Sequence, residues 1–246
     1  MTINHNEKSR IVDGAELAVL FIHGILGSPD HFDKFYELVP STVSYRAILL
    51  RGHGRRVTDF TKSNMNEWRA DAAVAVEELL KTHKEVILVA HSMGTLFSIQ
   101  EAVKHPERIK ALFLLNSPMK AYLHPRMFFG SFKVLRGKIK EGNEREEAMV
   151  RAYSLERDLR LWLYIGWIPR FLELFSEIRA TRKLIKDVTV KTQVFQSADD
   201  ELVRNSATKY LSFNKDFDIT TLQDSTHFYY AKEDLDTLLN EFKKLF

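Results

Sequence analysis

The chain has 246 residues, 45% of them hydrophobic, so one large domain, or one domain with an insertion, can bury a sizeable core. Its 36 basic and 33 acidic residues leave a formal net charge of +3, which argues against nucleic-acid binding because that function needs a strong basic excess. The absence of cysteine excludes disulfides, thiolate metal sites and a cysteine nucleophile.

The N-terminus and the most apolar long stretch indicate whether the sequence has a signal peptide or a membrane-spanning helix. Residues 1–10 are polar and lack the apolar region of a secretory signal peptide. Residues 159–175 are interrupted by Arg160, Pro169 and Arg170, whereas a membrane-spanning helix needs about 20 mainly apolar residues in a row. We therefore expect a cytoplasmic protein without a membrane-spanning segment.

Short apolar runs alternate with helical patterns along most of the chain. The runs predict strands at residues 17–22, 45–50, 85–90, 109–115, 192–196 and 218–222. The helical patterns cover residues 30–38, 66–81, 95–104, 203–211 and 233–246. This alternation predicts βαβ units, and hence an α/β fold with a mostly parallel sheet flanked by helices.

The alternation stops in the middle of the chain. Residues 119–188 contain no convincing buried strand and instead look helical, charged and rich in large aromatic side chains. We therefore divide the chain into a first part of the core at residues 1–118, a helical lid or cap at 119–190, and a second part of the core at 191–246.

The strand predicted at residues 85–90 runs into a pattern typical of a nucleophile elbow. Ser92 lies between the small residues Ala90 and Gly94, and a helical pattern follows at once. The tight turn would lift the serine hydroxyl clear of the sheet, with the helix N-terminus beside it. The alternative interpretation is a buried strand followed by an ordinary serine N-cap.

A serine nucleophile needs a base and a carboxylate, and both follow predicted strands. His227 comes shortly after the last strand, and Asp200 comes after the strand at residues 192–196. The order Ser92, Asp200, His227 fits a catalytic triad on this kind of sheet. Asp199 competes for the acid role; Asp200 is favoured because it directly precedes the pattern of a short helix.

An oxyanion hole requires two N–H donors near the nucleophile. The backbone N–H of Met93 and that of Ile25, in the loop after the first strand, are the candidates. His23 should orient that loop, and His91 should point away from the nucleophile. No histidine pair has metal-ligand spacing and no glycine pattern is typical of nucleotide binding, so we expect neither a metal nor another cofactor.

Several of these motifs together resemble the α/β-hydrolase superfamily, and within it the small carboxylesterase and monoacylglycerol-lipase-like branch. The matching positions are residues 23–28, 51–54, 90–94, 106–109, 196–203 and His227. The resemblance implies a core sheet with a lid at residues 119–190, and residues 10–12 as a remnant of the antiparallel opening strands. Ala90 and Thr95 depart from the glycines that are frequent there.

The leading functional hypothesis is a serine esterase acting on a small-molecule ester with an apolar acyl group, such as a monoacylglycerol. Hydrolysis of thioesters or amides, or acyl transfer, would use the same triad and stays open. A ligand-binding protein that has lost catalysis is the alternative from another class. Membrane contact through residues 159–175 is a further, less favoured hypothesis, and the sequence leaves the oligomeric state open.

Overall fold

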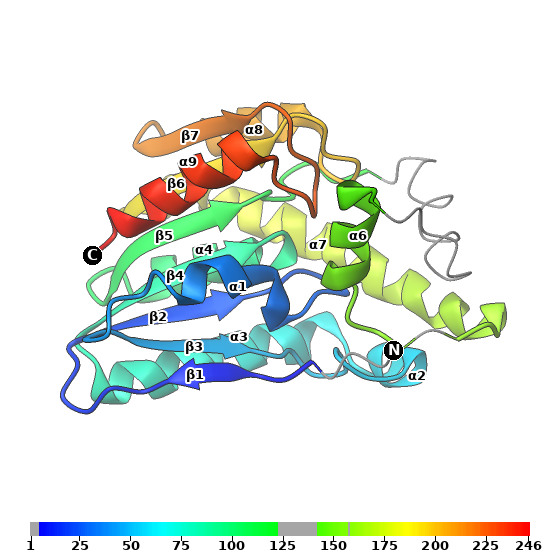
Figure 1. The fold of residues 1–246 in the computed structure, drawn as a ribbon, viewed down its shortest axis with the longest axis horizontal. Helices are drawn as coiled ribbons and strands as arrows, with labels where there is room; N and C mark the ends of the chain where they lie inside the picture. The colour runs from blue at the N-terminus through cyan, green and yellow to red at the C-terminus, as the bar shows by residue number, and fades with distance from the viewer. Residues whose placement is uncertain (1–4, 123–141, 157) are drawn as a thin grey trace.

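The computed structural model describes residues 5–122, 142–156 and 158–246, and these are built around a seven-stranded sheet (Figure 1). The sheet has the order β1-β3-β2-β4-β5-β6-β7, and every neighbouring pair is parallel except β1 and β3. The strands are β1 (Lys8–Arg10), β2 (Leu17–Ile22), β3 (Ser44–Ile48), β4 (Glu85–His91), β5 (Ile109–Leu115), β6 (Lys191–Ser197) and β7 (Phe217–Leu222). The predicted mostly parallel α/β sheet is confirmed. The antiparallel strand β1 begins two residues before the remnant expected at residues 10–12 and shares Arg10 with it.

Strand β2 is an example of a central strand that is buried on both faces, which is why its residues are apolar without a break. Ala18, Leu20 and Ile22 belong to one core cluster, whereas Val19 and Phe21 belong to another on the opposite face. Both faces of the sheet are therefore covered, so neither set of alternating side chains meets water.

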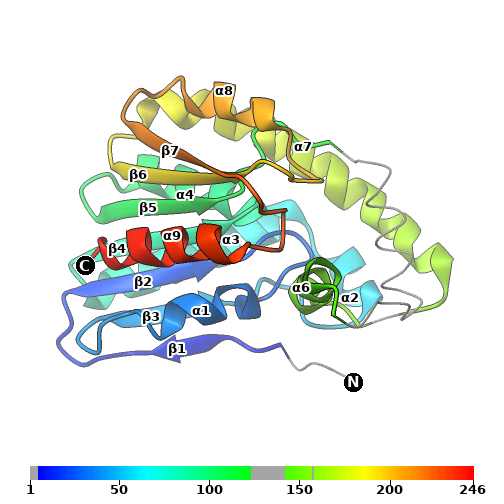
Figure 2. The same cartoon turned by 45° about the horizontal axis from the view of Figure 1, so that its top comes forward.

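Helices form one layer on each face of the sheet. Figure 2 shows α1 and α9 on one side of the sheet and α3 and α4 on the other. The helices are α1 (Asp33–Tyr36), α2 (Val57–Lys62), α3 (Met65–Thr82), α4 (Met93–Lys104), α6 (Glu144–Ala152), α7 (Trp167–Leu184), α8 (Thr208–Leu211) and α9 (Lys232–Lys243). Asn64 and Glu67 form a reciprocal capping box at the start of α3, which satisfies N–H groups that the helix itself cannot pair.

Two predicted helices differ from the structure. Residues 203–211 do not form one helix, because Val203 pairs with Ala121 as an isolated bridge and only a 3₁₀ turn (Asn205–Ala207) precedes α8. Residues 30–38 begin as a 3₁₀ turn (Pro29–Phe32) before α1. Helix α2 was not predicted.

The segment between β5 and β6 contains α6, a 3₁₀ turn (Leu161–Gly166) and α7 in its described part; residues 123–141 of the expected lid lie outside the described residues. In both views α6 lies beyond the carboxyl ends of the strands (Figures 1 and 2). Helix α7 packs into the core through Leu174, near its middle, and through Ile178 in its second half. Its first half and the turn before it expose large apolar side chains: Leu161, Trp162, Ile165, Ile168 and Leu172.

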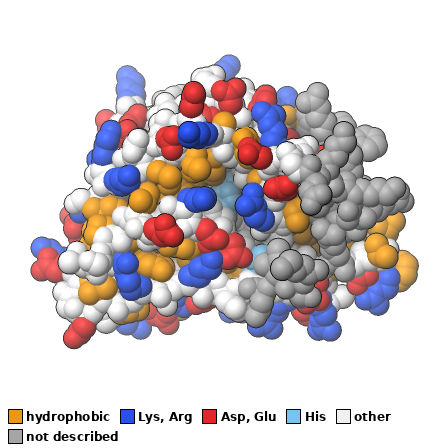
Figure 3. Space-filling view, viewed as in Figure 1, with side chains coloured by type: hydrophobic (Ala, Val, Ile, Leu, Met, Phe, Trp, Pro, Cys, Tyr) orange, Lys and Arg blue, Asp and Glu red, His pale blue; other side chains and the backbone are white. Residues whose placement is uncertain are grey.

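The molecular surface carries mixed charge on the face of Figure 3, where lysine and arginine are interspersed with aspartate and glutamate. Within the described ranges, no helix is both long enough and apolar enough to cross a membrane.

Candidate active site

The turn between β4 and α4 holds Ser92 in an unusual backbone conformation. Its φ is 51° and its ψ is −122°, and its N–H donates to the carbonyl of Leu115 on the neighbouring strand. Gly94 is required by close packing, because a Cβ there would lie 2.2 Å from the carbonyl oxygen of Ile22. Ala90 is fully buried in the core, so its methyl group is accommodated in place of the usual glycine.

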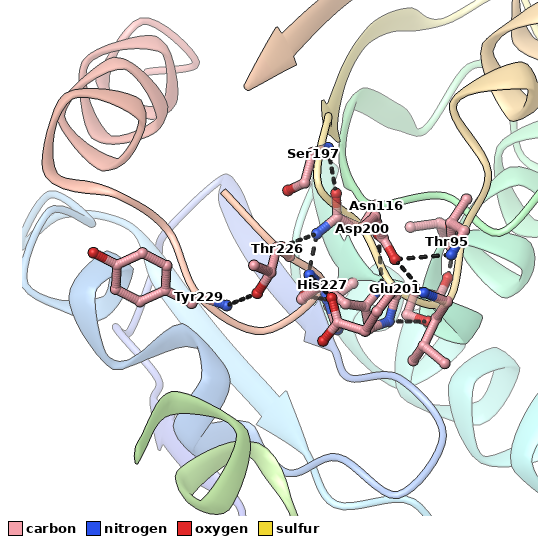
Figure 4. Close-up of polar contacts among 12 residues, drawn as sticks. Thr95, Asn116, Ser197, Asp200, Glu201, Thr226, His227 and Tyr229 are labelled. Atoms are coloured by element: carbon pink, nitrogen blue, oxygen red, sulfur yellow. Dashed lines mark hydrogen bonds and ion pairs between the residues drawn. The ribbon is translucent and has the colours of Figure 1, made fainter. Parts of the chain in front are cut away.

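The structure brings Ser92, His227 and Asp200 together in a single hydrogen-bonded chain. The imidazole Nε2 of His227 lies 3.0 Å from Ser92 Oγ, and its Nδ1 lies 2.8 Å from Asp200 Oδ2. These side chains come from the ends of β4 and β6 and from the loop after β7, and Figure 4 shows the contact between Asp200 and His227. A hydroxyl, an imidazole and a carboxylate in this order can pass a proton from serine to histidine.

The two neighbouring aspartates have different surroundings. The side chain of Asp200 is fully buried, and its Oδ1 accepts from the N–H groups of Leu202 and Val203, both at 2.8 Å. The side chain of Asp199 is 64% exposed and faces Arg145, with 3.4 Å between Oδ2 and Nη1. Only Asp200 therefore has the geometry to orient the imidazole of His227.

The environment of His227 raises the pKa of its imidazole above the ordinary value of 6.5. Burial acts in the opposite direction and is the largest single effect. The negative charge of Asp200, its hydrogen bond to Nδ1 and the charge of Glu201 together outweigh that burial.

Two side chains that the sequence analysis did not assign to the site hold the loop that carries His227. Asn116 Nδ2 donates to the carbonyls of Thr226 and His227, at 3.3 and 3.1 Å, while its Oδ1 accepts from Ser197 N (Figure 4). His91, which we expected to point away from Ser92, contacts the same loop, with its Nε2 2.9 Å from the carbonyl of His227. His91 ends β4 and Asn116 directly follows β5, and this position at the carboxyl ends of strands is the sequence feature that could have indicated them.

The predicted oxyanion donors are the N–H of Met93, which directly follows Ser92, and that of Ile25, which directly follows Gly24. Gly24 approaches the serine so closely that a Cβ there would lie 2.8 Å from Ser92 Cβ. The N–H groups of Ile25, in the same loop, and of Met93 have no acceptor among the described residues. Both donors are therefore free for a ligand, as an oxyanion hole requires.

Buried histidines hold the loop after β2. His23 bonds to the Gly24 carbonyl and accepts from Leu50 N, and His53 Nε2 accepts from Leu26 N at 3.1 Å. Burial lowers the pKa of His23 to about 4 and that of His53 well below 6.5, so both rings are neutral and can accept. Among the described residues, no group of three or more potential ligands could hold a metal ion.

Comparisons with known proteins agree on the kind of fold. The solved structure reported for the metagenome-derived lipolytic enzymes LipS and LipT has a TM-score of 0.76 and 17% identity, covering 98% of this chain and 97% of that one. The monoacylglycerol lipase of Paleococcus ferrophilus has a TM-score of 0.69 and 15% identity, covering 97% of each chain. At these identities the likeness establishes the α/β-hydrolase fold.

Sequence comparison identifies the family. A putative esterase/lipase from Haemophilus influenzae is 32% identical over 124 residues, which is 49% of this chain and 42% of that protein. The chain spans less than half the length of the first curated relatives that it matches. The model of the hydrolase family described as serine aminopeptidase, S33, matches residues 14–230. The chain therefore belongs to this S33 family of α/β-hydrolases.

Proposed function

We propose that the protein is a serine hydrolase that cleaves carboxylic esters, with Ser92 as nucleophile, His227 as general base and acid, and Asp200 as the orienting carboxylate. The observation that carries this proposal is the unbroken contact from Asp200 Oδ2 through the imidazole to Ser92 Oγ, at 2.8 and 3.0 Å. The full burial of Asp200 supports it further, because a dry carboxylate stabilises the imidazolium more strongly than a hydrated one.

The reaction follows from this geometry. Ser92 Oγ attacks the ester carbonyl carbon while its proton moves to Nε2 of His227. The N–H groups of Ile25 and Met93 stabilise the oxyanion. Nε2 then protonates the leaving alkoxide, which departs as the alcohol and leaves an acyl-serine. Water repeats the sequence, losing a proton to His227, and releases the carboxylic acid and the free serine.

A small-molecule ester with an apolar acyl group is the proposed substrate. Similarity to a putative esterase/lipase and to a monoacylglycerol lipase supports this class. We further propose that residues 119–190 cover the site as a helical lid, since α6 lies beyond the carboxyl ends of the strands and the first half of α7 presents apolar side chains. Such a surface suits an acyl chain better than a charged substrate.

A p-nitrophenyl ester series of increasing chain length tests the proposal, with matching thioesters and anilides to test the other leaving groups. We expect ester turnover, labelling of one serine by a fluorophosphonate, and a loss in kcat of about 10⁴- to 10⁶-fold in Ser92→Ala. Circular dichroism should show that the variant remains folded. Full activity in Ser92→Ala, or no labelling of the unmodified protein, would overturn the proposal, and faster anilide or thioester cleavage would change the substrate class.

A further inference from the structure

The backbone of His227 is held from both sides by side chains. Its N–H donates to Glu201 Oε2 at 3.1 Å, and its carbonyl accepts from His91 and Asn116 at 2.9 and 3.1 Å (Figure 4). Glu201 directly follows Asp200, so one turn of chain supplies a carboxylate to the imidazole and a second carboxylate to the backbone of the same residue.

We infer that Glu201 is a positioning residue that both fixes the His227 loop and makes the imidazole of His227 a stronger base. The inference rests on the proposed triad, since it concerns the base in that triad. The carboxylate is already bonded to the peptide N–H and part-buried, so it acts through His227 and does not touch the reacting atoms. Its charge favours the imidazolium that forms when Ser92 attacks.

The other groups around the imidazole leave Glu201 as a second source of negative charge beside Asp200. His91 packs against the His227 ring with 4.8 Å between ring centroids, and His31 packs against His91 with 3.9 Å between ring centroids. Burial lowers the pKa of both of these histidines, so both rings are neutral. Asp199 faces Arg145, which offsets its charge.

The variant Glu201→Gln separates charge from positioning, because the amide oxygen of glutamine can still accept the N–H of His227. We expect the pKa of His227 to fall by about 0.5 to 1 unit, as removal of a nearby, partly solvated charge predicts. The acidic limb of kcat/KM for p-nitrophenyl acetate should move to lower pH by the same amount, because the neutral imidazole is the active form. Turnover at pH 8.5 should change less than threefold.

Asp199→Asn is the matched control, since it removes a carboxylate two residues before Glu201 that faces Arg145; neither the pKa of His227 nor the acidic limb should move. Glu201→Ala removes the acceptor as well as the charge, so kcat should fall at every pH in addition to the shift. An unchanged acidic limb and an unchanged pKa of His227 in Glu201→Gln would overturn the inference.

A direct titration keeps the two proposals distinguishable. The Cε1–H proton resonance of His227, assigned with His227→Gln, reports the pKa by NMR without any turnover. If the unmodified protein hydrolyses no ester and takes up no fluorophosphonate, the proposed function fails, while the NMR titration still decides whether Glu201 raises the pKa of His227.

Discussion

Ser92 occupies a backbone conformation that L residues rarely adopt, and its neighbours hold it there. A positive φ of this kind costs about 1 to 3 kcal/mol unless the surroundings impose it. Here the N–H bonds to Leu115, and the carbonyl accepts both the N–H and the hydroxyl of Thr95, at 2.9 and 2.6 Å. The backbone of the proposed nucleophile is therefore fixed by hydrogen bonds to β5 and to the first turn of α4.

The choice between the two aspartates gives a residue-scale prediction. Asp200→Asn should lower kcat by about 10³- to 10⁴-fold, because an amide cannot hold the His227 tautomer in which Nδ1 carries the proton. Asp199→Asn should change kcat by less than about twofold, since that side chain is 64% exposed and faces Arg145. Ester turnover of both variants, with thermal unfolding to check the fold, measures the contrast. A larger loss in Asp199→Asn would reverse the assignment.

The sequence located the three side chains of the proposed triad but not those that support them. Ser92 and His227 could be predicted because each comes just past a recognisable strand and because the chemistry demands those residue types. Asn116 follows the end of a predicted strand, which places it at the right edge of the sheet, but Asn116 and Glu201 act on backbone atoms of a loop that is distant in the sequence, and no local pattern predicts those contacts. Asn116 also has a φ of 50°, a conformation that asparagine tolerates but that periodicity cannot indicate.

At the scale of whole elements, α7 is fixed to the core by a partly buried ion pair. Glu177 accepts from Arg69 of α3 at 3.0 and 3.1 Å and from Gln100 of α4 at 2.7 Å. The Glu177 side chain is 7% exposed and that of Arg69 is 40% exposed. One carboxylate thus joins three helices on the same face of the sheet, so the second half of α7 provides a rigid base for the segment before it.

Glu177→Ala should destabilise the protein by about 1 to 3 kcal/mol, because Arg69 loses its carboxylate partner. Among the described residues, Arg69 then keeps only Asn66, and Gln100 keeps only Thr181. The loss should be smaller than for a fully buried pair, since Arg69 can regain water. Urea unfolding measures the loss in unfolding free energy. Lys104→Ala is the control, because Lys104 also joins α4 to α3, through Glu77. Both of these side chains are about half exposed, so the loss in this variant should stay below about 0.5 kcal/mol. Equal losses in the two variants would contradict this account.

The ends of strands and helices could be predicted where they coincide with the ends of a buried apolar run. They could not be predicted where hydrogen bonds from side chains to the backbone set them. The strand at residues 109–115 was predicted with both ends correct, because every residue but Lys110 is buried. The helix predicted at 203–211 failed because Asp200 holds the N–H groups of Leu202 and Val203, and Val203 then pairs with Ala121. The strand order of the sheet was also beyond the reach of periodicity, which describes each strand separately.

For the whole molecule, the same burial that positions the site makes it sensitive to acid. Burial lowers the pKa of His23 to about 4 and that of His31 to about 3, and it lowers the pKa of His53 and His91 well below 6.5. Between those values and 6.5 the unfolded chain binds protons that the folded protein does not bind, so the free energy of unfolding falls as the pH falls. His227 has a raised pKa, so the stability that it contributes is fully present below pH 6.5 and is lost only as the pH rises through its folded pKa; it does not offset this loss in acid.

His23→Gln tests this acid sensitivity at a single position. Glutamine can still accept from Leu50 N and donate to the Gly24 carbonyl, so the variant removes the titrating ring and keeps both bonds. Between pH 7.5 and pH 5 the unmodified protein should lose about 2 kcal/mol more unfolding free energy than the variant, because the His23 contribution is lost below the unfolded pKa of 6.5. Urea unfolding followed by far-ultraviolet circular dichroism measures both slopes. Parallel pH dependence in the two proteins would mean that His23 binds its proton as readily in the folded state as in the unfolded state, and the lowered pKa of His23 would be wrong.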